Sequence, residues 1–562
     1  MKKLFKGGTV INVFTDTAEK TDVLVENGRI IGVGTDYEAD EIIEVTGKYL
    51  CPGFIDGHIH IESTMLLPAG FAKAAAPHGT TAVITDPHEI ANVCGTDGIK
   101  FMMSASEGLP VTVYFMVPSC VPATRFDESG AVLSADDIER FYGDPRVLGL
   151  AEMMNYPGII FDDPATLEKV RRTLAHGLIV NGHAPLLTGK DLDKYIAAGI
   201  TDDHECSNME EALEKLRKGQ RIMIRQGTAA RNLAGLSGLF DEPYSRRCIL
   251  ATDDKHPADL IANGHIDSMI RLAVELGKSV FAGIRMATIQ AAEYYGLRGK
   301  GAIAPGYDAD ILVLDDLDTV RVGTVYKSGE KVAENGVCLP FEAPAVSEEI
   351  KQKVCNSFNV SEIKPTDLHI DGTGSRTCRV IGIIKDQLIT EEKLLPVNLD
   401  TNNGVDTQRD ILKIAVIERH HNTGHIGRGY ITGLGLKHGA IASSVSHDSH
   451  NLIVIGTNDE DMVAAANLIH KAGGGMISVR DGKILAEMPL PYAGLMTDAE
   501  PAAAAEQNEK VRQSVYALDV PADIEPFMTM AFVSLPVIPH IKLTTLGLVD
   551  VDKQELLPLF TD

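Results

Sequence analysis

The stretch GFIDGHIHIESTM, residues 53–65, decides the fold prediction. It follows an apolar run and a Cys51-Pro52 break, and it places His58 and His60 two residues apart where a strand is expected to end. Side chains two apart on a strand point to the same side, so both imidazoles can reach one ion. Either this pair binds a metal, or these are two structural histidines in a chain that has eighteen.

Seven further apolar runs resemble this one, because each ends in polar residues and is followed by a helical pattern. This alternation is typical of βαβ units around a parallel sheet. Eight units over roughly 250 residues match the size of a TIM-like (β/α)8 barrel, whose active site lies at the carboxyl ends of the strands. The eight predicted strand ends lie in residues 53–60, 80–89, 111–120, 147–154, 177–185, 199–205, 221–227 and 247–254.

The segments on either side of the predicted barrel have a different character. Short alternating strands with Gly, Asn and Asp turns occur before the barrel and return after it, so we expect one flanking β-sandwich built from both sides. The last two hundred residues combine strand patterns with a helix near 459–473, as in an α+β domain. The predicted domains are a composite β-sandwich (1–52 and 300–338), the α/β barrel (53–299), a linker (339–365) and a C-terminal α+β domain (366–562).

Composition limits the class of protein. With 562 residues the chain is longer than a single hydrophobic core normally supports, so we expect more than one domain. No apolar run approaches the roughly 18 residues needed to cross a bilayer. The eight cysteines form no C-x-x-C pair and no secretory signal is evident, so we expect a cytoplasmic protein with reduced thiols. A net charge of −26 disfavours nucleic acid and favours a small-molecule partner.

Six polar residues at the predicted strand ends carry the functional prediction. Two histidine pairs could each bind one ion, and a carboxylate between them could bridge both. Nitrogen and oxygen ligands without thiolate suit manganese, iron or zinc. Two ions about 3.5 to 4 Å apart lower the pKa of a shared water enough for hydrolysis, with an aspartate as proton acceptor. The expected ligands are His58, His60, Glu152, His183, His204 and Asp253, and Asp253 is also the expected proton acceptor.

These residues resemble the amidohydrolase superfamily and, more narrowly, its bacterial adenine deaminases. The similarity runs over essentially the whole chain, and Glu152 stands where many members of the superfamily carry a carboxylated lysine. The resemblance implies the six ligands above as a binuclear centre of manganese or iron, with zinc possible. It also implies hydrolysis of adenine to hypoxanthine and ammonia in purine salvage, and a homo-oligomer, most simply a homodimer. The motifs that carry it are GFIDGHIHIESTM, GTTAVITDPHEIANVCG, LGLAEMMNYPG, NGHAP, DDHE, GTAARNL, ATDDKHPADLIANGH and ITGLGLKHGAIASSVSHDSHN.

Attack at C6 of a purine also requires a proton at the neighbouring ring nitrogen. Glu62, His88 and Glu89 are the nearest candidates by sequence, and the sequence does not rank them. Glu62 could instead hold a ligand histidine in place. Asp254 and His256 are expected either to support the ligands or to contact substrate.

Two further features leave alternatives open. Arg225 is either functional or a solvent-facing cation beside a helix start, and Gln226 departs from the acidic residue of the family pattern. A histidine concentration near the C-terminus could cover the active site, bind another metal or consist of solvated side chains. We favour solvated side chains over a metal site, and still expect the SSVSHDSHN block to face the active site. The residues concerned are His420, His421, His425, His438, His447, Asp448 and His450.

Two rival functions remain at the level of sequence. Another binuclear amidohydrolase could act on a cyclic amide or an N-acyl substrate. A non-catalytic assembly protein could keep the barrel, but such a protein would be expected to lose some of the six ligands.

Overall fold

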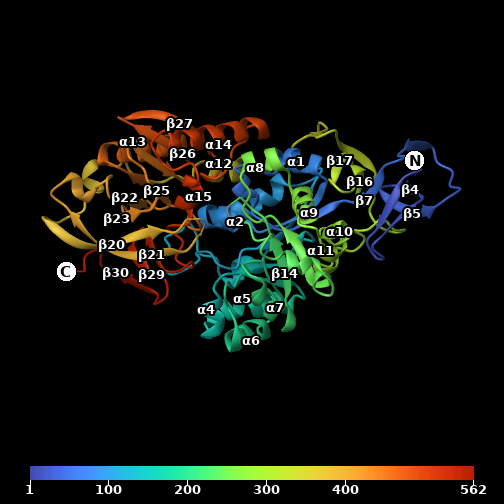
Figure 1. Cartoon of the computed structure of the whole chain (residues 1–562), viewed down its shortest axis with the longest axis horizontal. Helices are drawn as coiled ribbons and strands as arrows, with labels where there is room; N and C mark the ends of the chain where they lie inside the picture. The colour runs from blue at the N-terminus through green and yellow to red at the C-terminus, as the bar shows by residue number, and fades with distance from the viewer. Residues whose placement is uncertain (229, 386, 562) are drawn as a thin grey trace. The chain divides into compact units, whose positions relative to one another are not determined.

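Two structural units share the chain, and neither is a continuous stretch of sequence (Figure 1). The computed structural model describes residues 1–228, 230–385 and 387–561. Unit 1 consists of Met1–Asp86, Met102–Ser119 and Ser134–Ala345. Unit 2 consists of Pro87–Phe101, Cys120–Leu133 and Val346–Asp562. Two short segments that follow strands of the predicted barrel therefore group with the C-terminal part of the chain.

All eight strands predicted between residues 53 and 254 are present in unit 1. Five form one parallel sheet and three form another. The backbone N–H of Thr201 donates to Val180 at 3.4 Å between the two sheets, and Ile59 forms a parallel bridge with Asp253. This curled parallel arrangement agrees with the predicted α/β class and is consistent with a TIM-like barrel. The strands are β8 (Phe54–Ile59), β9 (Thr80–Thr85), β10 (Thr112–Val117), β11 (Val147–Met153), β12 (Ile179–Gly182), β13 (Asp202–Asp203), β14 (Arg221–Arg225) and β15 (Cys248–Ala251).

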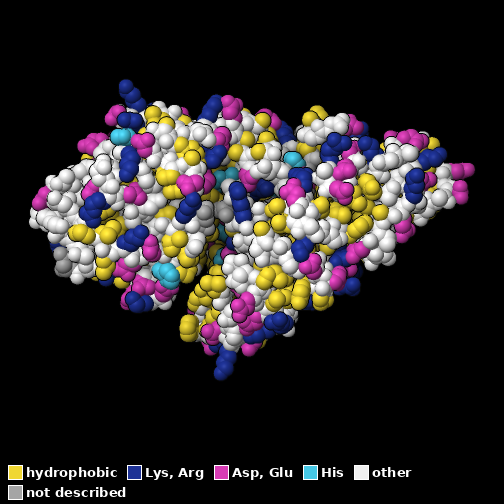
Figure 2. All heavy atoms as spheres, viewed as in Figure 1, with side chains coloured by type: hydrophobic (Ala, Val, Ile, Leu, Met, Phe, Trp, Pro, Cys, Tyr) yellow, Lys and Arg dark blue, Asp and Glu magenta, His cyan; other side chains and the backbone are white. Residues whose placement is uncertain are grey.

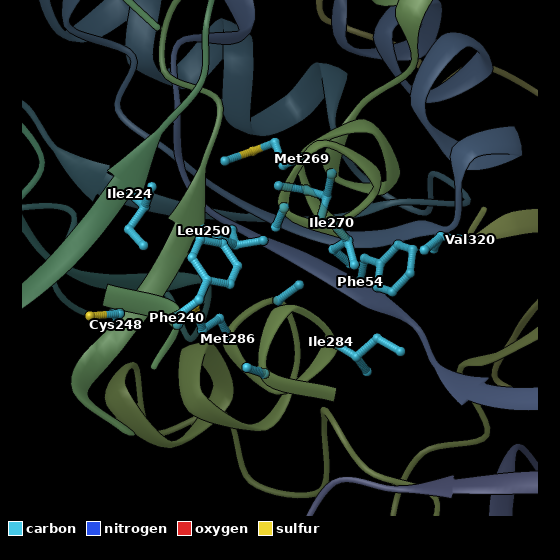
Figure 3. Packing of buried hydrophobic residues seen from close by; sticks show 14 of the residues in the cluster. Phe54, Ile224, Phe240, Cys248, Leu250, Met269, Ile270, Ile284, Met286 and Val320 are labelled. Carbon is cyan, nitrogen blue, oxygen red and sulfur yellow. The ribbon is translucent and has the colours of Figure 1, made fainter. Parts of the chain in front are cut away.

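Helices follow most of these strands and bury one face each. In α9 (Ile266–Glu275) the residues Ile266, Met269, Ile270 and Ala273 are buried, which is the spacing of a single helical face. They join a core cluster with Phe54 and neighbouring strand residues (Figure 3). The other helices are α1 (Pro68–Ala75), α2 (His88–Ala105), α3 (Ala135–Glu139), α4 (Tyr156–Ile160), α5 (Pro164–Ala175), α6 (Gly189–Ala197), α7 (Met209–Arg217), α8 (Pro257–Asn263), α10 (Val280–Met286) and α11 (Ile289–Tyr294).

Strands from before and after the parallel sheets pair with each other in unit 1. One seven-stranded sheet has the order β19-β18-β17-β16-β7-β2-β3, and in it Ile311 of β16 pairs antiparallel with Pro52 of β7. A four-stranded sheet has the order β5-β4-β1-β6. The strands are β1 (Lys2–Lys6), β2 (Thr9–Asn12), β3 (Thr17–Lys20), β4 (Asp22–Glu26), β5 (Arg29–Gly34), β6 (Glu41–Glu44), β7 (Tyr49–Pro52), β16 (Ile311–Asp316), β17 (Arg321–Lys327), β18 (Glu330–Glu334) and β19 (Val337–Cys338).

Unit 2 is built on an eight-stranded sheet of order β21-β20-β23-β22-β25-β24-β26-β27, beside a three-stranded sheet, β28-β29-β30. The predicted helix at 459–473 is α13 (Asp459–Ala472), which packs its buried face on this larger sheet. The remaining elements are β20 (Ser375–Ile383), β21 (Thr390–Asn398), β22 (Leu412–Ile417), β23 (Ile426–Thr432), β24 (Ala440–Ser443), β25 (Leu452–Gly456), β26 (Gly475–Arg480), β27 (Lys483–Pro489), β28 (Ile541–Thr544), β29 (Gly547–Asp550), β30 (Glu555–Leu557), α12 (Glu348–Cys355), α14 (Pro501–Tyr516) and α15 (Pro526–Ala531).

The charged side chains on the surface and the state of the cysteines agree with what the composition predicts. Acidic and basic side chains are interspersed over the face shown in Figure 2. All eight cysteines are free thiols. Within the described part of the chain, no helix combines the length and the apolar character needed to cross a membrane.

A buried ion network fixes the ends of β12 and β13, from which two of the predicted ligands project. The Lys215 ammonium is fully buried and donates to Glu211 Oε1 at 2.7 Å and Asp203 Oδ2 at 3.1 Å. It also donates to the carbonyl of Ala184 at 2.7 Å. Asp203 in turn accepts the backbone N–H of Ala184 at 3.0 Å and that of Glu205 at 2.7 Å. The network therefore ties the residues after His183 and His204 to α7.

We expect Lys215→Met to lower the free energy of unfolding by about 3 to 5 kcal/mol, because it leaves two buried carboxylates without a counter-charge. Urea unfolding of the metal-free protein would measure the change. Lys218→Met is the matched control, since Lys218 lies three residues further on, forms solvent-screened pairs with Asp193 and Glu214, and donates to the carbonyl of Gly189 at an exposed position. Equal effects of the two substitutions would contradict the structural role of Lys215.

Candidate metal centre

The local structure of β8 prepares His58 and His60 for a shared ligand. The Nδ1 atom of His60 lies 3.0 Å from the carbonyl oxygen of Asp86, which can only accept a hydrogen bond. Nδ1 therefore carries a hydrogen, so Nε2 is the nitrogen through which this ring would coordinate an ion. The His58 backbone is held by Asp56, whose Oδ1 accepts the His58 N–H at 3.2 Å. Both imidazole rings are buried.

Glu152, near the end of β11, stands between two histidine pairs. Its Oε1 atom lies 3.3 Å from His60 Nε2 and 3.7 Å from His58 Nε2. Its Oε2 atom lies 2.5 Å from His183 Nδ1 and 3.2 Å from His204 Nε2. Each carboxylate oxygen thus faces one pair, which is the arrangement that a bridging ligand requires.

Asp253 follows β15 and completes the first pair. Its Oδ1 atom lies 3.3 Å from His58 Nε2 and 3.2 Å from His60 Nε2. Its φ angle of 59° is in the left-handed region, which aspartate tolerates better than most residues and which often occurs at functional sites. The Asp253 N–H donates to the His58 carbonyl at 3.0 Å, so the backbone of β8 fixes this turn.

Glu205 and Arg225 belong to the site, although the sequence did not single out Glu205. The Arg225 guanidinium is buried and donates to Asp253 Oδ2 at 2.9 Å and to both oxygens of Glu205, the Nη2 bond to Oε2 being 3.0 Å. Glu205 Oε1 lies 3.6 Å from His183 Nδ1 and 3.5 Å from His204 Nε2. The interpretation of Arg225 as solvent-facing is wrong, because its side chain is buried and paired with Glu205 and Asp253, which follow the adjacent strands β13 and β15.

The pKa shifts follow this charge pattern. Burial acts to raise the pKa of Glu152, but the imidazoles of His183 and His204 hold it well below its ordinary value. Burial opposes ionisation of Asp253 as well, and Arg225 together with the two neighbouring histidines lowers its pKa well below the ordinary value. Both carboxylates are therefore anionic at neutral pH and able to act as ligands.

The donor set fits divalent cations. Buried imidazole nitrogens and carboxylate oxygens converge without a thiolate, a donor set that suits manganese, iron or zinc. The Nε2 atom of His58 is buried and has no hydrogen-bond partner among the described residues, an arrangement that a bound ion would satisfy. Three groups of ligand atoms in unit 1 are close enough to hold an ion: His58, His60 and Asp253; His58, Glu152 and His204; and His183, His204 and Glu205.

The three candidates for the donor of the ring proton belong to different structural units. Glu62 lies in a buried 3-10 turn directly after His60, in unit 1. His88 and Glu89 begin α2 and group with unit 2. Of the residues expected to support the site, Asp254 accepts a hydrogen bond from Ser63 Oγ at 2.6 Å. His256, the residue before α8, is buried.

The C-terminal histidines fall into two classes. His421, His425 and His438 are exposed, in agreement with the expectation of solvated side chains. That expectation is wrong for the other three, because these histidines follow buried strands or lie in a buried loop, where backbone hydrogen bonds hold them. The buried ones are His420, His447 and His450, together with Asp448.

Comparison with known proteins gives two matching families. The amidohydrolase family matches residues 49–332, and the adenine deaminase C-terminal domain matches residues 387–555. Adenine deaminase 2 of Carboxydothermus hydrogenoformans is 46% identical, over 99% of this chain and 96% of that protein. The adenine deaminase of Desulfatibacillum aliphaticivorans is 45% identical, over 99% and 97%. That of Clostridium acetobutylicum is 44% identical, over 98% and 96%.

Removing the arginine should expose its electrostatic role. We expect Arg225→Met to lower the free energy of unfolding of the metal-free protein by about 3 to 5 kcal/mol, because Glu205 and Asp253 lose their buried counter-charge. Arg225→Lys should recover part of the loss, since an ammonium keeps the charge but not the planar fork. Arg171→Met, at an exposed pair with Glu168, serves as control in the same urea titration. An Arg225→Met protein as stable as this control would refute the assignment.

Proposed function

This chain belongs to the adenine deaminase family of the amidohydrolases, and from that premise we propose how its residues act in the hydrolysis of adenine. The enzyme is a metal-dependent hydrolase that converts adenine and water to hypoxanthine and ammonia. The observation that carries the proposed residue roles is the position of Glu152, with one carboxylate oxygen against each histidine pair.

The proposed ligand roles follow from this geometry. His58, His60 and Asp253 would hold one divalent ion through Nε2, Nε2 and Oδ1. His183 and His204 would hold the second through Nδ1 and Nε2, and Glu152 would bridge the two. Two such ions, when bound, lower the pKa of a shared water and polarise the bond under attack.

Asp253 is the proposed proton acceptor. Arg225 occupies its Oδ2 atom, so Oδ1 is the oxygen that faces the histidine pair and that would accept a proton from the reacting water. When the water oxygen forms its bond to C6 of adenine, the water proton passes to this carboxylate. As the C6–N bond breaks, the same carboxyl returns the proton to the leaving nitrogen and ammonia departs, while the remaining hydroxyl proton at C6 restores the group that protonated the ring, leaving the C6=O of hypoxanthine.

The ring nitrogen beside C6 gains a proton during the attack, and an acidic side chain must supply it. Glu62, His88 and Glu89 remain the proposed candidates. Glu62 lies two positions after His60, and Glu89 lies four positions after the end of β9. Because β9 pairs in parallel with β8, its carboxyl end lies at the same edge of the sheet as His58 and His60.

Several finer points stay predictions. We propose manganese or iron as the native ions, in keeping with a ligand set that lacks thiolate. The role in purine salvage, the homodimer, the cytoplasmic location and the domain boundaries at 52, 299, 338 and 365 likewise remain predictions. The composite β-sandwich is supported by the pairing of β7 with β16, and the α+β character of residues 366–562 by the sheets and helices of unit 2.

The substrate assignment has a direct test. We expect protein loaded with manganese or iron to convert adenine to hypoxanthine, seen as an ultraviolet absorbance change together with release of ammonia. Protein stripped of metal by a chelator should lose this activity and regain it when metal is returned. Failure of both metal-loaded forms to act on adenine, combined with hydrolysis of a cyclic amide, would overturn the assignment.

The bridging role of Glu152 predicts a specific loss. We expect Glu152→Gln to bind fewer than two ions per chain and to lose turnover, because a neutral amide is a poor bridge between two dications. Elemental analysis of the purified protein measures the first effect independently of activity. Glu275→Gln makes the same chemical change at an exposed position at the end of α9 and should leave both quantities unchanged. Two ions per chain and normal turnover in Glu152→Gln would refute the bridge.

A further inference from the structure

A buried loop of unit 2, residues 446–451, presents two imidazoles to Glu89. This loop SHDSHN is fully buried, although every residue in it is polar. His447 Nδ1 lies 3.8 Å from Glu89 Oε1, and His450 Nε2 lies 4.0 Å from Glu89 Oε2. Glu89 is one of the three candidates for the ring proton, so the loop surrounds a group with a proposed role in catalysis.

The backbone determines which nitrogen of His450 carries the proton. The Ser446 N–H donates to His450 Nδ1 at 3.2 Å, so Nδ1 has a lone pair and no hydrogen. Burial lowers the pKa of His450 well below its ordinary value, and the ring is neutral. A neutral imidazole with an unprotonated Nδ1 must carry its hydrogen on Nε2. The atom that faces Glu89 is therefore a hydrogen-bond donor.

This tautomer excludes a metal-binding role for His450. A metal ligand needs the Nε2 lone pair, which would move the hydrogen to Nδ1 and against the Ser446 N–H. No described residue accepts a hydrogen bond from His450 Nε2, and Glu89 Oε2 lies roughly one ångström beyond the usual N–H···O distance of about 2.9 Å.

Arg419 holds the His450 backbone in place. Its Nε atom donates to the carbonyl oxygen of His450, and its Nη2 atom donates to that of Ala493 at 2.8 Å. Both acceptor residues have positive φ angles, 52° for His450 and 58° for Ala493, a backbone conformation that residues other than glycine rarely adopt. The buried guanidinium thus stabilises the turn that directs the imidazole.

We propose that His450 is a positioning residue, whose Nε2–H group binds Glu89 Oε2 and orients that carboxyl group for proton transfer to the purine ring. The inference rests on the proposed deamination of adenine and selects Glu89 among the three candidates.

Two substitutions separate this hydrogen bond from the loop structure. His450→Asn keeps an acceptor for the Ser446 N–H and tolerates the positive φ angle, but it has no donor at the Nε2 position. His450→Gln places an amide donor close to that position. We expect His450→Asn to lower kcat at least about tenfold with KM and metal content unchanged, and His450→Gln to recover much of the loss. His438→Asn, at an exposed histidine of the same unit, should behave as the unmodified protein.

A double substitution and a spectroscopic measurement complete the test. In a Glu89→Gln background, His450→Asn should cause no further loss of kcat, because both changes remove the same interaction. In metal-free protein with 15N-labelled histidine, one Nε2–H resonance should vanish in His450→Asn and shift in Glu89→Gln. The inference would be overturned by an unchanged kcat in His450→Asn, by additive losses of kcat in the double substitution, or by an Nε2–H resonance that does not shift in Glu89→Gln. If the unmodified protein fails to deaminate adenine, the proposed function fails, and the resonance alone then decides whether the contact exists.

Discussion

The division of the Glu152 carboxylate between two histidine pairs is the constraint on which the site depends. An anion buried this deeply is costly unless cations or hydrogen-bond donors surround it on every side. Glu152 Oε1 faces the pair from β8, and Oε2 faces the pair that follows β12 and β13. Only strands that end at the same edge of a curled parallel sheet can bring four imidazoles from these positions to one carboxylate.

Two buried cations, Arg225 and Lys215, balance the charges of the other carboxylates around the proposed ligands. Arg225 neutralises Glu205 and engages the outer oxygen of Asp253, which leaves the inner oxygen for the histidine pair. Beneath the strand ends, Lys215 performs the same function for Asp203 and Glu211. Each of these cations pairs with two carboxylates, so these buried acids have a counter-charge that does not depend on a metal. This explains how a chain of net charge −26 can gather so many acids in one place.

The sequence predicted what depends on local periodicity and missed what depends on neighbours. The eight strands could be predicted from apolar runs, and the six ligands were proposed because six of these runs carry histidine or carboxylate where the strand ends. Glu205 directly follows the proposed ligand His204, yet its contact with Arg225 on the next strand could not be foreseen, because no spacing rule in the sequence connects them. The burial of His447 and His450 was likewise not predictable, because a polar loop looks solvated until the partners of its backbone are known. The grouping of Pro87–Phe101 with unit 2 is a third example, since that segment continues a barrel strand in sequence.

The two buried histidines His60 and His450 show how the backbone assigns chemistry to identical side chains. A carbonyl oxygen, that of Asp86, faces Nδ1 of His60, so this nitrogen donates and Nε2 keeps its lone pair for a cation. A backbone N–H, that of Ser446, faces Nδ1 of His450, so this nitrogen accepts and Nε2 carries a hydrogen for a carboxylate. Burial also keeps the His450 ring neutral, so its single hydrogen stays on Nε2. A histidine count cannot therefore identify a metal site by itself, and the atom opposite Nδ1 must be known first.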